Sequence, residues 1–130
     1  MEITYRQASR TRGSLVYAFP LHEDSLARCG ERLHPIPPDL TDPEDLQEAR
    51  SFQAELIFDR VIDICHEIWP DRPDIQIGLD TNGKHHLLLA LIASTKRNDR
   101  IIPQGKTLEN LINAMVAEGF EQKPRWFTLA

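Results

Sequence analysis

The sequence predicts one α+β domain over residues 1–130, in which an antiparallel sheet packs in two layers against a long central helix and a C-terminal helix. Three observations lead to this prediction: short segments with strand-like alternation, a proline-bounded helical stretch over residues 43–69, and a second helical pattern at residues 108–116. The approximate order is ββαββαβ. With 130 residues, 41% of them hydrophobic and 27% charged, the chain has the size and composition of one globular domain with one core.

Two strands are expected near the N-terminus. Ile3, Tyr5 and Gln7 alternate with Thr4 and Arg6, and apolar residues recur at every second position in residues 15–21. Gly13 lies where a turn can join the two segments. The stretch from residue 33 to residue 43 then contains four prolines, which fix φ and remove amide donors. We expect a stiff, extended connection there.

The central helix has the clearest local signals. Asp42 can cap its N-terminus, Pro43 suits the first helical position, and Pro70 ends it. Phe52 and Leu56 lie on a different side from the main apolar stripe, which predicts that the buried face changes along the helix. The stripe itself consists of Ile57, Val61, Ile64, Cys65 and Ile68.

A hairpin is expected over residues 74–93, because Asn82-Gly83 is a favoured pair for a tight turn between strands. The rival is a helix over residues 84–97, where leucine and alanine dominate and β-branched residues are few. The second helix is expected to end at Gly119, and the apolar residues of 125–129 predict a last strand.

Charge and cysteine content narrow the classes of function. The formal net charge of -5 disfavours binding to nucleic acid or to an anionic membrane and suits a basic protein partner. Two cysteines are too few for a disulfide framework, and the longest apolar run, residues 87–93, is far shorter than a membrane span. Without an N-terminal segment of signal-peptide type, a cytoplasmic protein is expected.

Neither a metal site nor a catalytic thiol is expected. The spacings of the histidines and cysteines match no familiar zinc motif, and Asp63 with His66 forms only half of a helical di-iron element. Cys29 lies in a loop-like setting beside Arg28, which can lower a thiol pKa, but no signature links this cysteine to a histidine. We therefore expect no cofactor and no catalytic residue.

Four carboxylates recur at every fourth position of the central helix and form one acidic ridge: Glu55, Asp59, Asp63 and Glu67. Each like-charged pair at this spacing destabilises an isolated helix by about 0.2–0.5 kcal/mol. The simpler interpretation is a solvated face, partly relieved by Arg60 and His66. The functional interpretation is a docking surface for a basic protein, as in an immunity-type or inhibitor protein.

An alternative site lies before the second helix, at Gln104, Gly105, Lys106 and Thr107. A helix N-terminus with a nearby lysine can bind an anion through its free amides. Gln104-Gly105-Lys106 and the following helix resemble the acetyl-CoA loop of GNAT acetyltransferases, although Thr107-Leu108 occupies the place of the second small residue of that loop. The resemblance implies an acyl-CoA or other phosphorylated ligand, bound by a small transferase or a binding protein.

The hypothesis favoured from the sequence is a small, acidic, non-enzymatic protein-binding domain that uses the acidic ridge. A homodimer through the C-terminal strand, residues 125–129, is a further expectation, because an exposed strand edge offers unpaired backbone groups.

Overall fold

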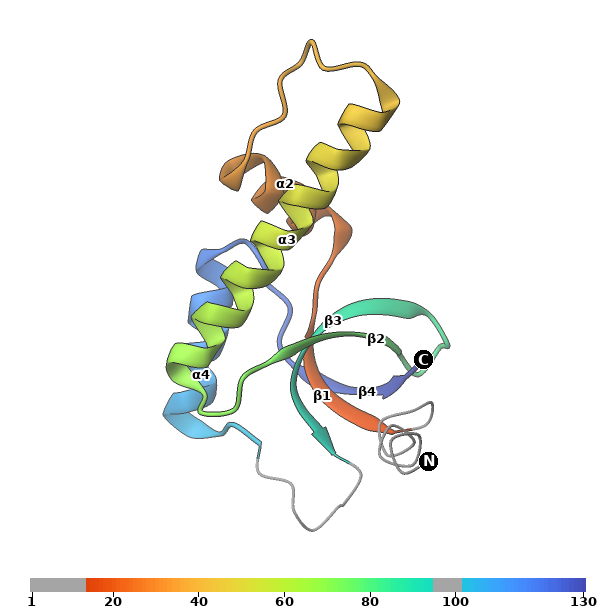
Figure 1. The fold of residues 1–130 in the computed structure, drawn as a ribbon. Helices are drawn as coiled ribbons and strands as arrows, with labels where there is room; N and C mark the ends of the chain where they lie inside the picture. Colours follow the sequence, from red (N-terminus) through yellow and green to blue (C-terminus); the bar gives the residue numbers. More distant parts are fainter. Residues whose placement is uncertain (1–13, 95–101) are drawn as a thin grey trace, which may run out of the picture.

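The computed structural model describes residues 14–94 and 102–130 (Figure 1). It confirms a mixed fold of helices and antiparallel strands. The predicted strand at residues 3–7 and the turn at Gly13 lie outside the described residues. The elements are, in chain order, β1 Leu15–Pro20, α2 Glu23–Leu33, α3 Pro43–Ile68, β2 Asp74–Leu79, β3 His85–Ser94, α4 Gly105–Ala117 and β4 Arg125–Leu129.

The four strands close into a small barrel in the order β1-β3-β2-β4, with every pair antiparallel. Figure 1 shows α2, α3 and α4 gathered along one side of this barrel. The sequence predicted a sheet layer covered by helices but not its closure. Closure depends on β4 returning to pair with both β1 and β2, which are contacts between residues far apart in the chain.

Each face of the sheet has its own core. Side chains that point into the barrel form a compact apolar cluster: Val16, Ala18, Leu88, Ala90, Phe127 and Leu129. Side chains on the other face, such as Tyr17, Phe19 and Leu89, pack with Ile57 and Val61 of α3 and with residues of α4. The helices therefore cover only the outer face of part of the barrel.

Helix α2 is missing from the predicted order, and the loop-like setting proposed for Cys29 is wrong. The spacing of Leu26, Cys29 and Leu33 is helical, but the segment is short and charged, and Gly30 weakens the pattern. Gly30 has a packing role, because a Cβ there would lie 3.1 Å from Gln53 Oε1 of α3. The glycine thus allows α2 to approach α3 closely.

The hairpin prediction for residues 74–93 is confirmed, and the rival helix is wrong over residues 84–94. Gly83 has a φ of 80°, which suits a turn residue without a Cβ. The segment β3 looked helical because both of its faces are buried, one in the barrel and one against the helices. A strand buried on both faces loses its alternation of apolar and polar residues.

Helix α3 begins and ends where the prolines predict, with Asp42 and Trp69 at its caps. Asp42 makes no side-chain capping hydrogen bond, so the cap expected from its carboxylate is not formed, although its charge still lies at the positive end of the helix dipole. The expected change of buried face is wrong for Phe52, whose surface is 45% exposed. None of the described helices has the length and apolar character that a membrane span requires.

Candidate functional site

The acidic ridge lies on the side of α3 that faces away from the core. Glu55, Asp59, Asp63 and Glu67 are all exposed, whereas Ile57, Val61 and Cys65 of the same helix are buried. Packing of the buried stripe fixes the helix, so the four carboxylates are carried on a rigid element. Their exposure agrees with both sequence interpretations, a solvated face and a docking surface.

Arg60, which was expected to relieve the ridge, is engaged elsewhere. Its Nη2 atom donates a hydrogen bond of 2.9 Å to Oε2 of Glu118, a buried residue that follows α4. Among described residues, the only ion pair made by a ridge carboxylate is the 3.8 Å contact between Asp63 Oδ1 and Arg72 Nη1, and both side chains are exposed. Most of the negative charge on this surface is therefore uncompensated by ion pairs within the described part of the chain.

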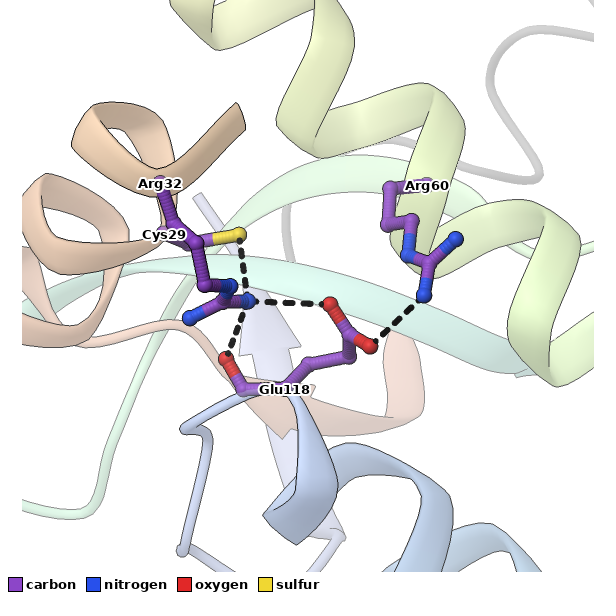
Figure 2. A network of polar contacts seen from close by, with 4 residues as sticks. All are labelled: Cys29, Arg32, Arg60 and Glu118. Carbon is purple, nitrogen blue, oxygen red and sulfur yellow. Dashed lines mark hydrogen bonds and ion pairs between the residues drawn. The ribbon is translucent and has the colours of Figure 1, made fainter. Parts of the chain in front are cut away.

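Glu118 joins the three helices through one carboxylate. Figure 2 shows Arg32 of α2 and Arg60 of α3 reaching it, with Arg32 Nη2 at 3.0 Å from Oε1 and at 3.3 Å from the Glu118 carbonyl oxygen. The hydrogen bond from Arg60 holds the pKa of Glu118 below its ordinary value, although burial acts in the opposite direction. This network is a structural clamp, since every member already has a partner.

Cys29 belongs to the same network and is fully buried. Arg32 Nη2 lies 3.6 Å from its sulfur, whereas Arg28 contacts Ser25 instead. Burial raises the pKa of the Cys29 thiol despite the nearby guanidinium, and burial raises the pKa of Cys65 to about 12. Arg28 therefore does not lower the pKa of the Cys29 thiol, and both free thiols have the environment of core residues.

Phe52 lies at the surface, not against a second packed layer as the sequence predicted. It lies three residues before Glu55 and seven before Asp59, so it shares the outer side of α3 with the ridge. Its ring meets that of His34 edge to face at 4.8 Å between centroids. The signal in the sequence was its position between Glu48 and Glu55, both polar neighbours on the same helical side.

The turn at the start of α4 places its predicted residues at the surface. Gln104, Gly105 and Lys106 are exposed, Thr107 is half-buried, and Gly105 has a φ of 59°. Lys106 Nζ pairs with Glu109 Oε1 at 2.9 Å, which offsets its positive charge. Residues 102–104 are not a strand, unlike the arrangement that the acetyl-CoA loop implies. Ligand binding at this turn stays a prediction.

A second network of polar contacts lies at the turn between β2 and β3. Asp80 Oδ1 accepts hydrogen bonds from the backbone amides of Asn82 and Lys84 at 2.8 and 3.0 Å, and Oδ2 lies 2.8 Å from His86 Nε2. These bonds, above all the one with His86, lower the pKa of Asp80 to about 2. His86 also meets the Phe127 ring and lines a cavity of about 570 Å³ with His22.

The described part of the chain contains no group of three or more histidine, cysteine, aspartate or glutamate residues placed to hold a metal ion. Adjacent His85 and His86 face opposite sides of β3, with His85 exposed. The Asp80–His86 pair is thus best described as a brace of the β2–β3 turn.

The C-terminal strand is already paired on both sides over part of its length. Residues 125–128 of β4 pair with β1, and Thr128 and Leu129 pair with β2. Phe127 points into the barrel, while Trp126 is half-buried against Tyr17 at 5.3 Å between ring centroids. A homodimer through this strand stays a prediction, with less free edge than an open sheet would offer.

Comparison with known proteins gives no lead: no family model, no curated protein and no solved structure matches this chain.

Proposed function

We propose that this chain is a small protein-binding domain, of the immunity or inhibitor type, that contacts a basic partner protein through the outer side of α3. The observation that carries the proposal is the exposed Phe52 beside the acidic ridge. Interfaces draw much of their binding energy from a few aromatic anchors, and complementary charge around them speeds association. Phe52 supplies the anchor and the ridge supplies the charge.

The engagement of Arg60, together with the exposure of Phe52, supports this surface over a merely solvated face. Arg60 is held by Glu118, so it does not fold back over the carboxylates. Phe52 keeps 45% of its surface exposed on a helix whose opposite side is well packed, although burial of a large apolar side chain is favourable in free energy. A partner that covers Phe52 would recover part of that free energy.

The test is to identify a basic protein captured by this domain from its native host and to measure its affinity for charge-reversal variants. Asp59→Lys combined with Asp63→Lys should weaken binding by about tenfold or more, because like charges would then face each other across the interface. The fold should be unaffected, since both side chains are exposed.

A matched control makes the same change of net charge away from the ridge. Asp39→Lys combined with Glu121→Lys alters two exposed residues outside α3 and should leave affinity within about twofold of the wild type. Equal weakening by both double variants would mean that only net charge matters, and no weakening by either would remove the ridge from the interface.

A further inference from the structure

A large apolar hollow lies on the inner side of the first half of α3, away from the acidic ridge. Its volume is about 700 Å³, within the roughly 300–1,000 Å³ typical of small-molecule sites. It is bounded by α2, by the proline-rich connection of residues 34–42, by α3 and by Leu87 of β3. It is separate from the turn at Gln104 to Thr107, none of whose residues lines it.

The walls are apolar side chains that folding leaves only half covered: Leu26, Ile36, Leu40, Leu46, Phe58 and Leu87. They come from four different elements and converge on one space. An apolar occupant that displaced water from that space would bury these side chains further, which is favourable in free energy.

The connection that borders this space is stiffened by prolines and tied to α3 at its start. Pro37 and Pro38 fix the backbone, and the Leu40 amide donates to the Pro37 carbonyl oxygen at 3.1 Å. Gln53 of α3 donates from Nε2 to the carbonyl oxygen of His34 at 2.8 Å, which ties the start of the connection to the helix. The cavity is therefore preformed, which reduces the entropy lost on binding.

Polar groups at the rim restrict the head group of an occupant. Arg50 lines the cavity, is exposed, and makes no ion pair within residues 14–94 and 102–130. Glu31 lines it too and accepts a hydrogen bond from Gln53 Nε2 at 3.3 Å. The guanidinium of Arg50 suits a carboxylate. Glu31 repels any anion placed beside it, and this repulsion is smaller for one negative charge at Arg50 than for the two or more charges of a phosphate.

We propose that this cavity binds a small amphipathic carboxylic acid, with its hydrocarbon chain between α2, the connection and α3 and its carboxylate at Arg50. This binding is independent of the partner surface on the outer side of α3, so either proposal can fail alone.

The test compares three ligands of equal chain length that differ in head group: decanoate, decanol and decyltrimethylammonium, each below its micelle-forming concentration. Binding is followed by backbone amide chemical-shift changes on the whole chain and by the melting temperature. Decanoate should shift amides of residues 26–58 that border the cavity and raise the melting temperature, with an affinity several-fold above that of decanol. The cationic ligand should bind most weakly.

Arg50→Gln should remove the preference for decanoate over decanol, whereas Arg28→Gln, an exposed arginine of α2 that does not line the cavity, should keep it. Ala54→Phe should fill part of the space and weaken the binding of decanoate and of decanol. Absence of binding by all three ligands, binding that maps elsewhere, or an intact preference in Arg50→Gln would overturn the proposal.

Discussion

At the scale of single residues, Asp80 shows how one carboxylate holds both a turn and a strand. Its two oxygens are occupied by backbone amides of the turn and by His86 of β3. The sequence indicated the turn through Asn82-Gly83, but the bond to His86 depends on strand register, which brings residue 86 opposite Gly78. Local pattern does not fix such a register.

The depressed pKa of Asp80 predicts a specific acid sensitivity. Because the folded-state pKa is about 2, below the ordinary 3.8, the charged form stabilises the folded protein. This contribution is complete above about pH 4 and is lost as pH falls towards the folded pKa. The free energy of unfolding of the wild type should therefore fall more steeply between these limits than that of Asp80→Asn, as measured by urea denaturation at a series of pH values. Parallel curves would contradict this assignment.

The two thiols give a second prediction at this scale. Cys29 and Cys65 are completely buried and their thiol pKa values are raised, so neither supplies accessible thiolate at neutral pH. Ellman's reagent should react slowly with the native protein. After denaturation it should react readily with both thiols. Fast reaction of one thiol in the native state would show that α2 or α3 opens readily.

At the scale of elements, the ends of α3 could be predicted because prolines act through local sterics. Helix α2 could not, because its apolar spacing is brief and its stability depends on contacts with α3 and α4. The sequence of β3 is compatible with both a strand and a helix for a different reason. Its apolar side chains cover two buried faces, so the alternation typical of a strand is lost. In both cases tertiary packing outweighs local pattern.

The clamp at Glu118 predicts how strongly the helices depend on one another. Glu118→Gln removes the charge that two guanidinium groups share and should lower the free energy of unfolding by about 1–3 kcal/mol in urea. Because Arg32 and Arg60 are partly exposed and solvent screens their charges, we expect a loss of free energy of unfolding towards the lower end of this range. Glu121→Gln, at an exposed position nearby, should have almost no effect. Equal stability of the two variants would show that the clamp is dispensable.

At the scale of the whole molecule, α3 separates two surfaces of different character. Its inner side covers the barrel and borders the apolar cavity, and its outer side carries the ridge and Phe52. The ridge could be predicted because helical periodicity alone sets the side on which four carboxylates lie. The polar neighbours Glu48 and Glu55 indicated the exposure of Phe52 only in part, because it depends on whether another layer covers that side. Barrel closure likewise depends on the long-range pairing of β4.

The central claim, that the outer side of α3 binds a basic partner, is tested most directly by the salt dependence of the dissociation constant. For the wild type, affinity should fall steadily as salt rises, because the ridge contributes by charge. The Asp59→Lys and Asp63→Lys double variant should bind more weakly and lose most of this dependence. Phe52→Ala should weaken binding at every salt concentration with the wild-type slope, since its contribution is apolar. A salt dependence that is the same in the wild type and the ridge variant would contradict the claim.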